Sequence, residues 1–155
     1  MVLTKTKNIN ILVLSRSLFC NSRYTDAMHF PKAVIVYNPK STGDGHKNAL
    51  KFAKRLHRSR LADDIEVTAT THPRHAEELV SKFAAKYSPL LVVSSSGDGG
   101  YNEIVNGAVV VNLAGGDVVT GLLPSGNAND HYSALHKPYV LRRLKKDNLL
   151  RIDLL

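Results

Sequence analysis

The 155-residue sequence is poor in cysteine and has no long hydrophobic run. Its single cysteine, Cys20, excludes an internal disulfide framework and any C-x-x-C metal site. No eighteen consecutive residues are apolar, so no membrane-spanning helix is expected. With 43% hydrophobic and 22% charged residues, the sequence is instead typical of one globular domain that buries a core.

Two familiar phosphate-binding motifs are also absent. No stretch fits G-x-x-x-x-G-K-[S/T], which excludes a Walker-type phosphate loop. The stretch GDGGYN, which begins at Gly97, has Asn102 where the dinucleotide fingerprint G-x-G-x-x-G requires its third glycine. A glycine-rich loop is therefore present without either standard signature.

Acidic residues are scarce in the first part of the chain. Residues 1–60 hold twelve lysines and arginines against two acids, Asp26 and Asp44, and the whole chain carries a net charge of +8. This balance favours anionic partners such as nucleotide phosphates or a lipid surface, and a solvated cationic helix face is an equally good explanation. Few aromatic residues lie among these charges, which argues against nucleic-acid binding.

Residues 1–30 differ in character from the rest. Residues 1–25 contain four basic residues and no acid around a short apolar core, a composition shared with targeting segments. Alternatively, Met28 is the natural start. Because Ser15 and Arg16 interrupt the apolar run, we expect a dispensable or disordered extension, followed by one domain over residues 31–155.

From residue 31 onward, strand and helix patterns alternate at short spacing. This order predicts an α/β fold with a Rossmann-like parallel sheet flanked by helices, whose ligands bind beyond the carboxyl ends of the strands. The predicted strands are 33–37, 65–70, 90–93, 117–124 and 149–155. The predicted helices are 46–59, 74–87, 101–111 and 138–148.

Three loops rich in glycine and polar residues each follow a predicted strand. The first loop covers residues 38–43, the second loop residues 96–103 and the third loop residues 124–130. In a parallel sheet these loops share one edge, where glycine lets backbone N–H groups approach an anion. A carboxylate among phosphate-binding groups would be repulsive, so Asp98 suggests contact with Mg²⁺ or a general base.

Three stretches resemble the signature loops of the diacylglycerol kinase catalytic domain family: NPKSTGDG, SGDGGYNEIVNG and LLPSGNAND. That family, which includes bacterial lipid kinases and sphingosine kinases, typically shows N-P-x-S-G, then G-G-D-G-T with x-N-E-V-V-N-G, then P-x-G-T-x-N-D. The order and spacing match across about residues 31–135. The implied fold is the N-terminal domain shared by NAD kinases and diacylglycerol kinases.

By this resemblance, the chain transfers the γ-phosphoryl group of ATP to a lipid hydroxyl, with Mg²⁺ as the metal and Asp98 as the catalytic residue. The implied acceptor is diacylglycerol or a sphingoid base. The nucleotide-binding residues implied by the matching motifs are Asn38, Pro39, Lys40, Ser41, Thr42, Thr70, Gly97, Asp98, Gly99, Gly100, Tyr101, Asn102, Glu103 and Asn127. No residue is assigned as a metal ligand.

Several positions depart from the family pattern. Ser96 stands where the second motif usually has its first glycine, as in sphingosine kinases, and Gly100 stands where threonine is common. Thr42 replaces a glycine and Asn127 a threonine. Family members also carry a second, β-rich domain, which we expect this chain to lack or to receive from a partner chain.

Two alternatives stay open beside the lipid kinase. One is an NAD-kinase-type enzyme, because that group also uses a G-D-G loop, and the other is a non-catalytic nucleotide-binding subunit. We expect a nucleotide and a lipid as partners and a cytoplasmic location, with peripheral association at a membrane as a further option. The seven histidines lack supporting ligands at metal-site spacing, so surface or capping roles are expected for them.

Overall fold

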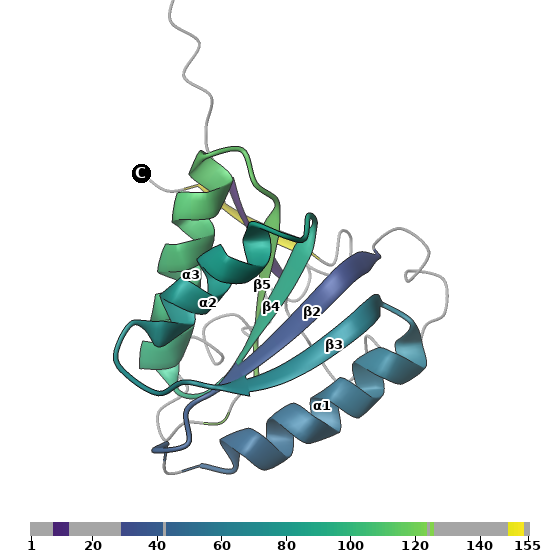
Figure 1. Ribbon diagram of the computed structural model, residues 1–155, viewed down its shortest axis with the longest axis vertical. Helices are drawn as coiled ribbons and strands as arrows, with labels where there is room; N and C mark the ends of the chain where they lie inside the picture. Colours follow the sequence, from purple (N-terminus) through teal and green to yellow (C-terminus); the bar gives the residue numbers. More distant parts are fainter. Residues whose placement is uncertain (1–7, 13–28, 42, 124, 126–148, 154–155) are drawn as a thin grey trace, which may run out of the picture.

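The computed structural model describes residues 8–12, 29–41, 43–123, 125 and 149–153. Figure 1 shows one twisted sheet with helices on both faces. The strand order is β3-β2-β4-β5-β1-β6. The strands are β1 (Asn8–Leu12), β2 (Phe30–Tyr37), β3 (Ala62–Ala69), β4 (Leu90–Ser95), β5 (Val118–Leu122) and β6 (Leu149–Asp153).

The sheet is parallel from β3 through β2, β4 and β5 to β1, and β6 pairs antiparallel with β1. The prediction of an α/β fold with a parallel, helix-flanked sheet is therefore confirmed. Asn8–Leu12 lies in the stretch expected to be an extension, and its backbone pairs with β5 and β6. The proposed boundary at residue 30 stays a prediction.

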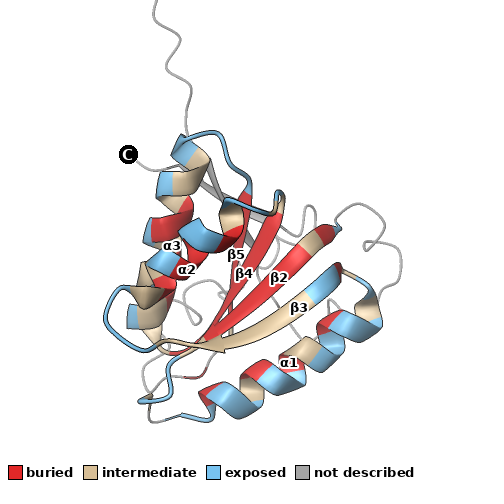
Figure 2. Cartoon of the chain, viewed as in Figure 1, coloured by how far each residue is buried: buried red, intermediate tan, exposed pale blue. Residues whose placement is uncertain are grey.

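Two hydrophobic layers cover the two faces of the sheet. Helix α1 (Gly45–Ser59) places Ala49, Phe52 and Leu56 against one face. Helices α2 (His75–Ala84) and α3 (Asp98–Leu113) cover the other face. Since successive strand residues point to opposite faces, β2 and β4 supply both layers, and both strands are largely buried, as is β5 (Figure 2).

One cation is buried within this framework. Lys32 on β2 is 5% exposed, and its Nζ lies 2.7 Å from Asp64 and 2.8 Å from Glu66, both on the neighbouring edge strand β3. Burial alone would lower the pKa of Lys32, but hydrogen bonds to the two carboxylates outweigh it and raise the pKa. Side chains of α2 and of the turn after it lie around this charge. The centroid of the Phe83 ring is 5.5 Å from the Lys32 ammonium nitrogen.

The chain order creates a switch point between β2 and β4. From β2 the chain crosses by α1 to β3 on one side, then returns by α2 to β4 on the other side. The connections that leave β2 and β4 therefore diverge to opposite faces of the sheet. In open α/β sheets, ligands bind in the crevice beyond the carboxyl ends of the strands at such a point.

Candidate functional site

The first and second loops begin level with each other at the carboxyl edge of the sheet. Tyr37, the last residue of β2, pairs with Ser95 of β4 and with Ala69 of β3. Ser94 of β4 in turn pairs with Leu122 of β5. The register therefore brings the connections after four neighbouring strands to one edge.

The first loop is a turn closed on itself. The backbone N–H of Lys40 donates to Asn38 Oδ1 at 2.9 Å, and the N–H of Ser41 donates to the Asn38 carbonyl oxygen at 3.1 Å. Asn38, Pro39 and Lys40 are exposed and Ser41 is half-buried. This Asx-type turn presents its polar groups to solvent beside the switch point.

Ser125 joins the loops to one another. Asn48 Nδ2 of α1 donates to Ser125 Oγ at 3.1 Å, and Ser95 Oγ lies 3.2 Å from the same hydroxyl. Ser41 Oγ donates to the Ser125 carbonyl oxygen at 3.4 Å. Ser125 is only 4% exposed. One buried residue of the third loop thus contacts the first loop, the end of β4 and the start of α1.

Close approach explains Gly43 in the first loop and Gly45 at the start of α1. A Cβ built on Gly43 would lie 2.2 Å from the Ser125 carbonyl oxygen, and one on Gly45 would lie 2.6 Å from the Ser95 carbonyl oxygen. Neither backbone oxygen can move aside, because each belongs to packed structure. These two glycines therefore serve contact between loops and not the approach of a ligand.

The three serines at the end of β4 alternate between the faces of the sheet. Ser95 Oγ donates to the Gly45 carbonyl oxygen at 2.7 Å on the α1 side. Ser94 and Ser96 share a hydrogen bond of 2.9 Å between their hydroxyls on the other side. All three are buried, and each has a polar partner. The strand thus ends in hydroxyls because it meets polar loop backbone there.

Helix α3 begins inside the glycine cluster, three residues earlier than the predicted helix. Gly97 is its N-cap residue in extended conformation, and no side chain caps the helix by a hydrogen bond. Gly99 is exposed, and a Cβ built on it would have no atom within 4 Å. The first N–H groups of a helix have no intrahelical acceptor and carry partial positive charge. This end of α3 can therefore receive an anion.

Gly100 has a different reason to be glycine. A Cβ at this position would lie 2.2 Å from Ser96 Oγ and 3.1 Å from Ser96 Cβ. The two departures from the family pattern are therefore complementary, because the serine at position 96 occupies the space that a side chain at position 100 would need.

Tyr101 and Glu103 face away from the surface of the second loop. Tyr101 is 3% exposed, its hydroxyl lies 3.4 Å from Thr120 Oγ1, and burial raises the pKa of the phenol. Glu103 Oε2 accepts a hydrogen bond from the Ala76 N–H at 3.3 Å, at the start of α2, where a carboxylate is favourable. Their side chains position α3, whereas Asn102 is exposed.

Thr70 lies beside the start of the first loop. Its N–H donates to the Tyr37 carbonyl oxygen at 2.9 Å, and its hydroxyl lies 3.5 Å from the same oxygen. The Tyr37 ring stacks on His46 of α1 with centroids 4.6 Å apart. His46 was not among the residues predicted for the site, although its place in the first turn of the helix after the loop was a usable signal.

Two of the predicted residues, Thr42 and Asn127, lie outside the described residues. The other predicted residues of the first and second loops and Thr70 lie at the one edge. A groove of about 490 Å³ lies elsewhere, between the last turns of α1 and the beginning of β3, where Lys54, Arg58, Asp63 and Asp64 line it. This groove is not part of the loop cluster.

The comparisons with known proteins agree with the fold. The family model described as "Diacylglycerol kinase catalytic domain" matches residues 32–154. Two solved structures from Bacillus anthracis strain Sterne, of proteins assigned as diacylglycerol kinases, match with 25% identity and TM-scores of 0.54 and 0.51. They cover 76% and 74% of this chain. No curated protein matches.

The chain spans only 40% and 39% of the length of these two solved structures. Within the part of the chain that the structure describes, no helix is both long enough and apolar enough to cross a membrane.

Proposed function

The chain belongs to the diacylglycerol kinase catalytic domain family, and from this premise we propose that it forms the ATP-binding part of a lipid kinase. The reaction is transfer of the γ-phosphoryl group of ATP to a lipid hydroxyl. Such transfer depends mainly on positioning and on neutralising charge, so a site built from backbone donors suits it.

The observation that carries the proposal is the start of α3. This 16-residue helix has no side-chain cap, and the space over Gly99 is open. Contacts within the protein explain Gly43, Gly45 and Gly100, whereas a Cβ built on Gly99 would have no atom within 4 Å. An unfilled position at a helix N-terminus, at the switch point of a parallel sheet, is a suitable place for phosphate groups.

The first loop would hold the nucleotide from the other side. Asn38 and Ser41 bring polar side chains, and Lys40, which directly precedes Ser41, adds an exposed positive charge. Thr70, next to Tyr37, extends the polar surface toward β3. These residues supply neutral donors and one cation, the groups that phosphate and ribose oxygens require.

The Asp98 carboxylate is better suited to bind a magnesium ion than to contact a phosphate directly. It is half-buried at the first position of α3, and Mg²⁺ is commonly held by one or two carboxylates together with substrate phosphates. When bound, the ion would neutralise charge on the phosphates. The Asp98 carboxylate would hold it or accept the proton of the lipid hydroxyl.

The test compares two valine substitutions on the same helix. Gly99→Val adds a side chain in the open space at the start of α3, and Ala114→Val adds one at its exposed end. We expect Gly99→Val to weaken ATP binding at least tenfold, about 1.4 kcal/mol, because the side chain displaces a phosphate. Ala114→Val should bind ATP as the unsubstituted chain does.

Binding is measured by displacement of a fluorescent ATP analogue in the presence of Mg²⁺. Equal affinity of the Gly99→Val variant and the unsubstituted chain would refute the site. Transfer of labelled phosphate is then measured with diacylglycerol, a sphingoid base and NAD as separate acceptors. Labelled NAD would indicate the NAD-kinase alternative, and binding of ATP without transfer to any acceptor would indicate a non-catalytic subunit.

A further inference from the structure

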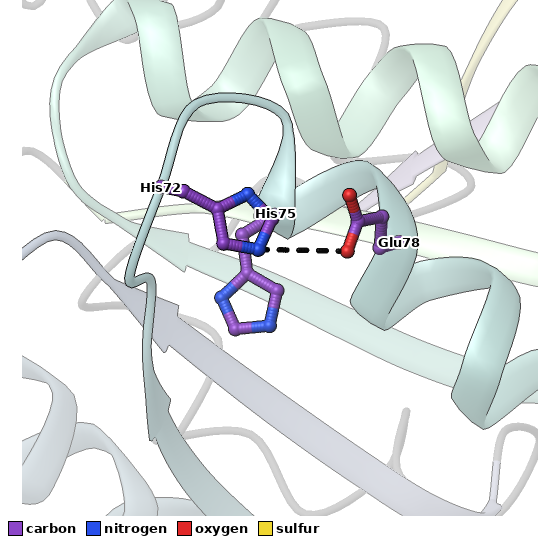
Figure 3. A group of neighbouring side chains, drawn as sticks. All are labelled: His72, His75 and Glu78. Carbon is purple, nitrogen blue, oxygen red and sulfur yellow. Dashed lines mark ion pairs between the residues drawn. The ribbon is translucent and has the colours of Figure 1, made fainter.

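Three side chains between β3 and α2 form a cluster that the nucleotide site does not use. His72, His75 and Glu78 each offer a ligand atom, and these atoms all lie within 4.8 Å of one another (Figure 3). His72 Nε2 and Glu78 Oε2 are 3.6 Å apart. Glu78 was not predicted as a partner of these histidines, although the sequence has the spacing His-x-x-His-x-x-Glu.

The ring of His72 is oriented by its other nitrogen. Its Nδ1 lies 3.0 Å from the Pro73 carbonyl oxygen, which can only accept a hydrogen bond, so Nδ1 carries a proton. In the neutral ring the lone pair then belongs to Nε2, which faces the Glu78 carboxylate. A lone pair next to a carboxylate oxygen is repulsive unless a cation lies between them or the ring is protonated.

The ring of His75 is held in a different way. Its Nδ1 accepts a hydrogen bond from the Thr71 N–H at 3.1 Å and lies 3.2 Å from Thr71 Oγ1. In the other tautomer Nδ1–H donates to Thr71 Oγ1, and the lone pair of Nε2 is then available to a metal ion. The ring also stacks on His72, with centroids 4.6 Å apart. Outer partners that fix the orientation of imidazoles are a regular feature of metal sites.

The neighbouring cation, Arg74, makes its hydrogen bonds to Glu77, although its charge also acts on Glu78. The Arg74 guanidinium pairs with Glu77 through two hydrogen bonds of 2.9 and 3.2 Å. Glu103, the closest carboxylate from α3, accepts from the Ala76 N–H. Glu78 therefore faces the two histidines, and the cluster holds two neutral ligands and one anionic ligand.

We propose that His72, His75 and Glu78 bind one Zn²⁺ ion. Two imidazoles and a carboxylate form a three-ligand set typical of zinc with an open fourth position, whereas Mg²⁺ prefers oxygen ligands alone. Ligand atoms about 2 Å from a tetrahedral zinc lie roughly 3.3 Å apart. His72 and Glu78 are already near this separation, and their exposed side chains can turn to close the rest.

Zinc at this position would tie the turn after β3 to the first two turns of α2. Thr70, two residues before His72, would then be held more firmly against Tyr37. The inference does not depend on the lipid kinase proposal, because it uses other side chains and another ion.

The experiment is a competition titration of the whole metal-free chain with Zn²⁺ and a chromogenic chelator. We expect one site, at least tenfold weaker in His72→Ala, in His75→Ala and in Glu78→Gln. The matched control is His57→Ala, an exposed histidine on α1 outside the cluster, which should bind within about twofold of the unsubstituted chain. Mg²⁺ in large excess should not displace the zinc.

Folding is checked by circular dichroism without metal, where all variants should match because the exchanged side chains are half-buried or exposed. Zn²⁺ should raise the melting temperature of the unsubstituted chain and of His57→Ala, but not that of His72→Ala. Equal zinc affinity of the unsubstituted chain and the His72→Ala/His75→Ala double variant would overturn the inference. Cys20 and the remaining histidines are common to these proteins, so their contribution cancels.

Discussion

At the scale of single residues, Ser96 and Gly100 illustrate how two departures from a family pattern depend on each other. The Ser96 hydroxyl bonds to Ser94 in a buried position and lies where a side chain at position 100 would begin. The family pattern places glycine and threonine at these positions, and this chain has a side chain and a glycine instead. In the family pattern the hydroxyl belongs to the threonine at position 100, whereas in this chain it belongs to Ser96.

A double-substitution cycle tests this dependence. Gly100→Thr alone should destabilise the fold by about 1–3 kcal/mol, because Ser96 must turn away from Ser94 and its Cβ stays too close. Adding Ser96→Gly should remove most of this loss, with a coupling energy of at least about 1 kcal/mol. Denaturant unfolding of the four proteins measures it, and additive effects would contradict the explanation.

Tyr101 makes the stability of the fold depend on alkaline pH. Burial raises the pKa of its phenol above the ordinary value of 10.0. Above that pH the unfolded chain loses a proton that the folded chain keeps, so stability is full below about pH 10 and falls as the pH rises. The loss from this group amounts to about 1.4 kcal/mol per pH unit until the folded phenol itself ionises.

Tyr101→Phe should therefore be less sensitive to alkali. At pH 7 we expect the free energy of unfolding to fall by no more than about 1 kcal/mol, through loss of the contact with Thr120. The difference in the free energy of unfolding between the variant and the unsubstituted chain should shift in favour of the variant when the pH is raised from 7 to 11. Urea unfolding at both values is the measurement, and an unchanged difference would rule out Tyr101 as a source of the pH dependence.

At the scale of secondary structure, two glycines of α3 have different surroundings. Gly107, in the second half of the helix, is buried against α2, where a Cβ would lie 3.0 Å from both the Glu77 carbonyl oxygen and Val80 Cβ. Gly99, in the first turn, faces open space. The same type of residue thus serves helix packing at one place and ligand access, as we propose, at the other.

The same substitution should therefore have opposite consequences at the two ends. Gly107→Val should destabilise the fold by about 1–3 kcal/mol, since the backbone of α2 must move away. Gly99→Val should change the free energy of unfolding by no more than about 0.5 kcal/mol while it weakens ATP binding. Thermal and urea unfolding, beside the ATP titration, separate the two effects. Equal destabilisation by the two substitutions would contradict this explanation, because it would show that other atoms pack against Gly99 at the start of α3.

Most helices and strands were predictable because their apolar residues form continuous runs or recur with the period of a helix. Continuous apolar runs predicted β2 and β4, and amphipathic spacing predicted α1 and α2. The start of α3 was predicted too late in the sequence, because Gly99 and Gly100 have low helix propensity. In the structure both residues nevertheless belong to the first turn of α3, at the edge of the sheet. The strand β1 was missed because a short apolar run beside basic residues is not specific to a sheet.

At the scale of the whole molecule, the sequence predicted which loops meet at one edge of the sheet but not how they contact one another. The role of Ser125 depends on Asn48 and Ser95, which are distant in the sequence. The burial of Lys32 likewise requires carboxylates from the strand beside it. Such long-range contacts leave no periodic trace, so local patterns could not predict them. Thr42 and Asn127 lie outside the described residues, and their roles stay predictions.

The position of β2 has a consequence for biosynthesis. It lies between β3 and β4 in the sheet, and both of these neighbours follow it in the chain. A nascent chain that has just left the ribosome therefore displays an apolar strand with at least one bare hydrogen-bonding edge until β4 has been translated. Chaperone occupancy on ribosomes stalled before residue 90 should accordingly exceed that on ribosomes stalled well beyond it.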